Sequence, residues 1–119
     1  MAKRKTKEEG SVLFDAYYHS MYQDRWPLLR HALQQKREPI AFSQGLLKSY
    51  YLDEASLVAP RLLNVEHGDM VLDMCAAPGG KTLVLAGALQ RTGRLVSNDR
   101  SSARRARLHQ VIEGHLSES

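Results

Sequence analysis

The first third of the chain spaces its apolar residues along one face of a helix and predicts two helices. Ser11 or Asp15 is the expected N-cap of the first helix. Its apolar positions are Phe14, Tyr17, Tyr18, Met21 and Tyr22. Pro27 suits the first turn of a second helix, which is expected to end in the polar run 34–38.

The middle of the chain mixes turn residues with aromatic ones. Residues 40–51 predict a loop that holds at most a short strand. Asp53 is a suitable N-cap for the helix that follows, and Pro60 is expected to kink that helix. The apolar positions of this helix are Ala55, Leu57, Val58, Leu62 and Leu63.

The last third of the chain consists of short apolar runs separated by turns. Residues 70–75 predict a strand, residues 76–80 break it with Ala-Ala-Pro-Gly-Gly, and residues 81–89 predict an apolar helix. Residues 94–98 predict a second strand, and one of the serines at 101–102 caps a further helix. This βαβα order predicts an α/β fold with a parallel sheet.

Composition narrows the class of protein without assigning a function. A length of 119 residues suits one core, and 43% hydrophobic with 25% charged residues is ordinary for a globular protein. The net charge of +4 favours a polyanionic partner such as RNA. A single cysteine, Cys75, and five histidines without paired spacing predict no metal site. Because no apolar run suits a membrane span or a signal peptide, we expect a cytoplasmic location and no membrane partner.

The break between the two predicted strands has the chemistry of a ligand site. A strand that enters a helix through a glycine-rich loop places unpaired backbone N–H groups at the carboxyl edge of the sheet. Gly79 and Gly80 are expected to let a ligand approach the backbone closely. Asp99 follows the second strand, where an acid accepts hydrogen bonds from both hydroxyls of a ribose. The spacing fits NAD, FAD or S-adenosylmethionine.

Two rival motifs match this loop less well. The dinucleotide pattern G-x-G-x-x-G lacks its first two glycines here, which argues against NAD. A phosphate-binding P-loop matches at Gly80-Lys81-Thr82, but Cys75 stands in the place of its first glycine. Asp73 would repel a triphosphate, whereas it attracts the ammonium and sulfonium groups of S-adenosylmethionine. A nucleotide-binding module with a degenerate P-loop remains the alternative.

The segment VLDMCAAPGGKT at 71–82 resembles the cofactor motif of the Sun/RsmB/RsmF family of RNA cytosine-C5 methyltransferases. YYLDEASLVAPRLL at 50–63 and NDRSSARRARL at 98–108 are similar to the segments on either side of that motif. FDAYYHSMYQDRWPLLRHAL at 14–33 is similar to the N-terminal helices of the branch that includes mitochondrial rRNA methyltransferases. The resemblance covers roughly residues 50–115.

The resemblance implies the N-terminal part of a class I (Rossmann-like) methyltransferase fold preceded by small helices. The domains expected are a disordered basic tail at 1–10, a helical segment at 11–51 and the first part of the methyltransferase domain at 52–119. The cofactor implied is S-adenosylmethionine, and the substrate is RNA, with rRNA ahead of tRNA. The cofactor-binding residues carried over from the family are Cys75, Ala76, Ala77, Pro78, Gly79, Gly80, Lys81, Asp99 and Arg104.

The family's chemistry uses a downstream cysteine thiolate that adds to C6 of cytosine, and a second cysteine that assists product release. These cysteines lie in Pro-Cys and Thr-Cys-Ser motifs, neither of which occurs in this sequence. Cys75 falls in the cofactor motif and is not expected to replace them. The chain is therefore expected to be a truncated product, the first half of a split gene or a frameshifted remnant, inactive alone. A complementing C-terminal half is a candidate partner.

Several of these residues have a purely structural alternative. Asp99 can act as a helix N-cap, and Asp73 can be a buried acid satisfied by loop amides. The tyrosines and Trp26 are expected to pack rather than to stack on bases. A cluster of arginines is either a solvated stripe or an RNA face, and a non-catalytic RNA-binding fragment is the third hypothesis. These arginines are Arg100, Arg104, Arg105 and Arg107.

Overall fold

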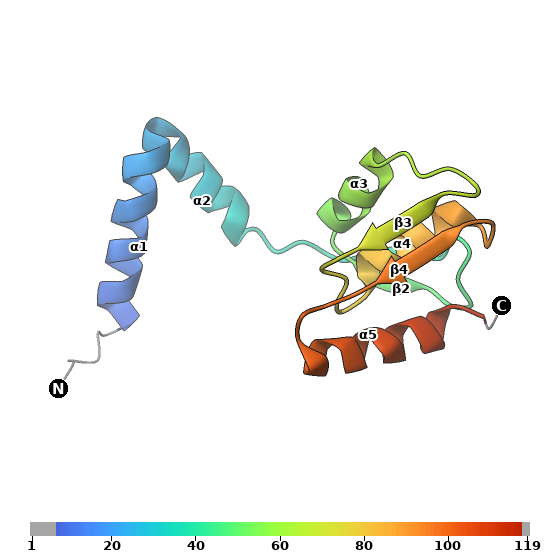
Figure 1. Cartoon of the computed structure of the whole chain (residues 1–119). Helices are drawn as coiled ribbons and strands as arrows, with labels where there is room; N and C mark the ends of the chain where they lie inside the picture. Colours follow the sequence, from blue (N-terminus) through green and yellow to red (C-terminus); the bar gives the residue numbers. More distant parts are fainter. Residues whose placement is uncertain (1–6, 118–119) are drawn as a thin grey trace. The chain divides into compact units, whose positions relative to one another are not determined.

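The computed structural model describes residues 7–117, which fall into two compact units that divide between Arg37 and Glu38 (Figure 1). The sequence placed this division after residue 51. The difference arises because Phe42 and Leu52 are buried in the same cluster as Leu57 and Val84 of the second unit. Residues 40–52 therefore belong to the α/β unit.

The first unit consists of α1 (Lys7–Tyr22), the short 3-10 helix η1 (Gln23–Arg25) and α2 (Trp26–Gln34). Helix α1 begins four residues before the predicted start at Ser11, so residues 7–10 are helical and the tail prediction is wrong for them. Lys-Glu-Glu at 7–9 favours this start, because these are good helix formers and acids suit the first turn. Residues 1–6 lie outside the described part of the chain.

An aromatic cluster joins α1 to α2. Trp26 is 5% exposed, and its ring centroid lies 5.1 Å from that of Tyr18 and 5.9 Å from that of Phe14. Arg30 Nε lies 3.0 Å from Asp15 Oδ1 and adds an ion pair between the helices. Pro27 occupies the first turn of α2, as predicted. The packing role expected for Trp26 is confirmed.

The second unit begins with a hairpin that the sequence did not predict. Strands β1 (Ile40–Phe42) and β2 (Tyr50–Leu52) pair antiparallel, with Phe42 opposite Tyr50. Helix α3 (Glu54–Leu62) follows, with Asp53 at its N-cap position and Pro60 inside it. The Asp53 side chain makes no capping hydrogen bond, so only its backbone position matches the prediction.

The predicted βαβα order is confirmed. Strands β3 (Met70–Asp73) and β4 (Arg94–Ser97) are parallel and in register from the Met70 and Arg94 pair to the Asp73 and Ser97 pair. Helix α4 (Gly80–Leu89) connects them, and α5 (Ser102–His115) follows β4. Both strands end slightly earlier than predicted. The fold is α/β.

Helix α4 supplies most of the core of the second unit. Six of its residues are buried, and Leu83 has no exposed surface. The buried α4 residues are Thr82, Leu83, Val84, Leu85, Gly87 and Leu89. In Figure 1, α4 lies behind β3 and β4, and residues of the two strands alternate between partly buried and exposed. The exposed face of this small sheet carries Met70, Leu72 and Val96.

Candidate cofactor site

The loop that follows β3 and the loop that follows β4 lie against each other at the carboxyl edge of the sheet. The Asn98 N–H donates to the Asp73 carbonyl, and the Ala76 N–H donates to the Asn98 carbonyl, each at 2.8 Å. These bonds extend the strand ladder beyond its last paired residues. They bring the motif loop beside Asp99, as the parallel arrangement predicted.

Gly79 is needed where the motif loop meets α5. Its φ is +122°, in a region that favours glycine, and a Cβ there would lie 3.0 Å from Val111 Cγ1 and 3.1 Å from Leu108 Cδ1. A Cβ on Gly80 would lie 3.1 Å from the Tyr50 ring. Packing against α5 explains the need for glycine at 79, and packing against the hairpin explains it at 80. The close approach of a ligand to these glycines stays a prediction.

The motif loop has a buried half and an exposed half. Ala76 and Ala77 are 5% and 6% exposed and pack against Leu108 of α5. Cys75 and Pro78 are exposed, and the Ala77–Pro78 peptide bond is cis. The loop is thus anchored through its alanines, while the cysteine and the proline face solvent.

Two side chains that a P-loop would use for phosphate and magnesium have partners within the protein. Thr82 is 1% exposed, and its hydroxyl donates to Asp73 Oδ2 at 2.8 Å. Lys81 is exposed, and its ammonium donates to the Ser56 hydroxyl of α3 at 3.1 Å. A P-loop needs that threonine oxygen for Mg²⁺ and that lysine for phosphate. These bonds disfavour the degenerate P-loop, and Asp73 is satisfied by a hydroxyl rather than by loop amides.

The Asp99 carboxylate is nearly buried at the end of β4. The residue is 4% exposed, and its Oδ1 accepts a hydrogen bond from the Ser101 N–H at 3.1 Å. Its Oδ2 lies 3.4 Å from Arg104 Nη2. Ser101 is the N-cap of α5, because its hydroxyl accepts from the Arg104 N–H at 3.4 Å. The N-cap alternative for Asp99 is wrong, and its role toward a ribose stays a prediction.

Two arginines in the first turn of α5 reach back to the loops. Arg104 Nη2 donates to the Ala77 carbonyl at 2.6 Å. Arg105 Nη1 donates to the carbonyls of Asp99 and Arg100 at 2.6 and 3.0 Å. Both arginines are exposed, so these contacts add a role toward the loops, and the solvated-stripe and RNA-face alternatives stay open for the cluster. The sequence analysis placed Arg105 only in the arginine cluster and did not predict its contact with the loop, although its position one turn after the Ser101 cap could have indicated it.

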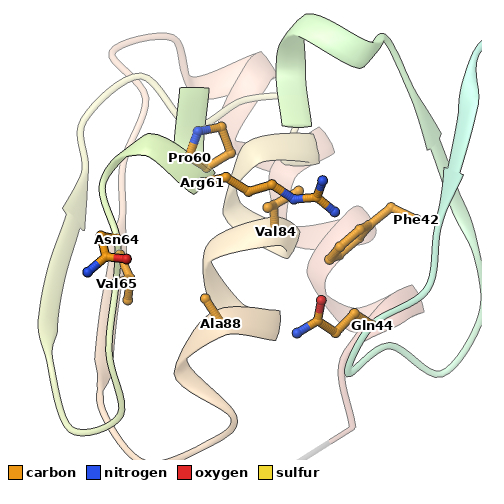
Figure 2. Close-up of a pocket in the computed structure, with 8 residues that line it drawn as sticks. All are labelled: Phe42, Gln44, Pro60, Arg61, Asn64, Val65, Val84 and Ala88. Carbon is orange, nitrogen blue, oxygen red and sulfur yellow. The ribbon is translucent and has the colours of Figure 1, made fainter. Parts of the chain in front are cut away.

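A small cavity lies on another side of the same unit, between α3, α4 and the segment after β1. Its volume is about 180 Å³, and Figure 2 shows Arg61 extending toward Phe42. Its lining residues are Phe42, Gln44, Pro60, Arg61, Asn64, Val65, Val84 and Ala88. None of the predicted cofactor residues contributes to it, so it is separate from the candidate site.

Among residues 7–117, no three His, Cys, Asp or Glu side chains come together as metal ligands would. Within the same range, every helix is too short or too polar to cross a membrane.

The matching family is described as "16S rRNA methyltransferase RsmB/F" and covers residues 60–117. The chain is 47% identical over 74 residues to "5-cytosine rRNA methyltransferase NSUN4" of Xenopus tropicalis. The aligned segment covers 62% of this chain and 18% of that relative. The chain is 36% identical over 100 residues to "tRNA (cytosine(34)-C(5))-methyltransferase, mitochondrial" of Mus musculus, covering 83% of this chain and 25% of that relative. The chain thus spans a quarter or less of the length of these relatives.

A bacterial relative and a solved structure agree with these matches. "Ribosomal RNA small subunit methyltransferase F" of Vibrio cholerae is 42% identical over 67 residues, which is 54% of this chain and 14% of that relative. The fold matches "Crystal Structure of PH0851" with a TM-score of 0.70 at 18% identity, over 95% of this chain and 37% of that one.

The fold is α/β, with the motif loop at the carboxyl edge of its two parallel strands, and this fold is shared with that solved structure. Over residues 60–117 the chain is similar to the RsmB/RsmF (Sun) family, and its Xenopus and mouse relatives are named as RNA 5-cytosine methyltransferases. One relative is named as mitochondrial, and the cytoplasmic location expected for this chain stays a prediction.

Proposed function

We propose that residues 38–117 form the S-adenosylmethionine-binding part of an RNA cytosine-C5 methyltransferase. The observation that carries the proposal is the placement of the 71–82 motif beside Asp99 at the carboxyl edge of two parallel strands. Open α/β sheets bind their ligands at this edge.

The groups at this edge suit the parts of the cofactor. The first backbone N–H groups of α4 have no acceptor within the helix and suit the methionine carboxylate. Asp73 supplies a negative charge for the ammonium or sulfonium cation. Asp99 Oδ2 has only a long contact at 3.4 Å, which leaves it able to accept from a ribose hydroxyl. The chain would thus bind and orient the methyl donor.

Methyl transfer itself needs a cysteine nucleophile in this family, as the resemblance implies. Cys75 is the single cysteine of the 119 residues, and it lies in the loop directly after β3. It is exposed beside the cofactor edge, in the motif that would hold the methyl donor. We therefore assign residues 38–117 to cofactor binding, and we assign the attack on cytosine to none of the 119 residues.

Isothermal titration calorimetry of the chain with S-adenosylmethionine and with ATP and Mg²⁺ tests the proposal. We expect binding of S-adenosylmethionine and none of ATP. Asp99→Asn should weaken binding at least about tenfold, because hydrogen bonds to a charged acceptor are the stronger ones. Asp53→Asn is the matched control, since it removes the same charge from a side chain without a capping bond. Preference for ATP, or equal effects of both variants, would contradict the proposal.

We assign RNA contact to residues 1–37 because the charge of the chain is uneven. Residues 1–37 hold eight Lys and Arg against four Asp and Glu, whereas residues 38–119 hold nine of each. The whole net charge of +4 therefore belongs to the first unit. Basic segments bind RNA through counterion release, which depends on salt.

Titration of a fluorescent single-stranded RNA of about 20 nucleotides at several salt concentrations tests this assignment. The triple change of Lys3, Lys5 and Lys7 to Gln should weaken binding and flatten its salt dependence. Lys48→Gln in the second unit is the control and should change little. RNA binding that does not vary with salt would contradict the assignment. An equal loss of RNA affinity per lysine in the control would also contradict it.

A further inference from the structure

The side chain of Arg104 bridges the two loops at the candidate cofactor edge. Its Nη2 donates to the Ala77 carbonyl at 2.6 Å and lies 3.4 Å from Asp99 Oδ2. We propose that Arg104 is a positioning residue, which holds the motif loop and Asp99 together before the cofactor binds. This inference rests on the proposed function, and it adds to the cofactor contact that the family resemblance implies for Arg104.

The bridge joins parts of the loops that lie beyond the strand ladder. The last backbone bond between them runs from the Ala76 N–H to the Asn98 carbonyl. Arg104 makes the next link, one residue further along each loop. The charged guanidinium strengthens the bond to the carbonyl, and Ala77 is 6% exposed, so water competes weakly for that acceptor. The bridge thus sets the spacing of the two loops that would hold the cofactor.

The first turn of α5 fixes the position of Arg104. The Ser101 hydroxyl accepts from the Arg104 N–H, and the Ser101 N–H donates to Asp99 Oδ1. Arg105 holds the backbone of the loop after β4 through the Asp99 carbonyl. The capped N-terminus of α5 therefore positions the Arg104 guanidinium beside the two loops. Lys at 104 would carry the charge on a more compact ammonium without the planar fork of donors, so it should restore the bridge in part.

Hydrogen exchange of the 119-residue chain without cofactor measures the bridge directly. Arg104→Ala should speed the exchange of amides in residues 75–80 by about tenfold, since the lost bond is charge-assisted. Arg104→Lys should give an intermediate rate. Arg107→Ala is the matched control, because it removes an exposed arginine from the same helix and should leave those amides unchanged.

The affinity for S-adenosylmethionine gives a second readout. If the loop is competent only when bridged, the Kd of Arg104→Ala should rise by the same factor as the loop exchange rate. Saturating S-adenosylmethionine should then return the loop amides to wild-type protection. A general loss of stability would instead speed exchange across β3, β4 and α4 and would overturn the inference.

The outcomes separate this inference from the proposed function. Wild-type binding of S-adenosylmethionine with unchanged loop exchange in Arg104→Ala would overturn the bridge and leave the function standing. A loosened loop in Arg104→Ala with no wild-type binding would support the bridge as a loop-positioning contact and overturn the function. If Arg104→Ala loses its helical circular dichroism signal, Arg104→Lys against Arg107→Lys makes the same comparison.

Discussion

The two units of the chain stabilise their helices in different ways. Among residues 9–37 only Trp26 is buried, although this region carries several large apolar side chains. In the second unit α4 alone buries six residues, and Leu83 is fully enclosed. Aromatic contacts and the Arg30–Asp15 ion pair join the helices of the first unit, whereas the second unit has a buried apolar cluster.

Helical spacing of apolar residues therefore does not by itself predict that these residues are buried. The apolar stripe of α1 includes Phe14, Tyr17 and Met21, and each of these residues is more than half exposed. Burial in α4 instead follows from its place between the sheet and the first hairpin. Stability should therefore depend on single residues in the second unit and much less so in the first.

Leu83→Ala should have the largest effect of the changes considered. It leaves a cavity at a fully buried position, which costs about 3 kcal/mol of unfolding free energy. Leu28→Ala in α2 is the control, since Leu28 is 76% exposed and should change stability by less than about 0.5 kcal/mol. Urea unfolding followed by circular dichroism measures the unfolding free energy of both variants. Equal losses would contradict the expected difference between the two units.

Gly79→Ala should destabilise the second unit by about 1 to 3 kcal/mol through its backbone conformation and its contact with α5. Gly68→Ala separates these causes. Gly68 also has a positive φ, +88°, but a Cβ there would meet nothing within 4 Å. Thermal unfolding measures both variants, and any stability that Gly79→Ala loses beyond the loss in Gly68→Ala is due to the contact with Val111 and Leu108. Equal losses would show that this packing contributes nothing.

Thr82→Val keeps the shape of a 1% exposed side chain but leaves Asp73 without its hydroxyl donor. We expect a loss of about 1 to 2 kcal/mol in urea unfolding. Arg30→Gln breaks the ion pair of the first unit, whose side chains are 48% and 31% exposed, and should cost less than about 0.5 kcal/mol. Fluorescence of Trp26, the single tryptophan, follows that unit separately. A larger loss at Arg30 would reverse the expected order.

Gly10→Ala should have the opposite sign and stabilise the first unit. Gly10 lies within α1, and a Cβ there would meet nothing within 4 Å. Alanine is favoured over glycine in a helix by about 0.8 to 1.0 kcal/mol, so the helical signal at 222 nm should grow. A decrease would show that α1 does not form as described.

The order of elements from residue 70 onward followed from the sequence because it depends on neighbouring residues. Short apolar runs, the Pro-Gly-Gly break and the Ser101 cap are local features, and the structure confirms the strands and helices they predicted. The sequence did not predict the hairpin at 40–52, because its strands have only three residues each. Phe42 and Leu52 of these strands pack with Leu57 and Val84, which are distant from Phe42 in the chain.

The α/β class, the family resemblance and the position of the motif loop follow from the sequence, because a run of twelve residues and local propensities carry that information. The packing of Gly79 on α5 and the hydrogen bond from Arg104 to the Ala77 carbonyl, 27 positions away in the chain, depend on the tertiary structure. Such contacts form only when β3, β4 and α5 come together, so no local pattern records them.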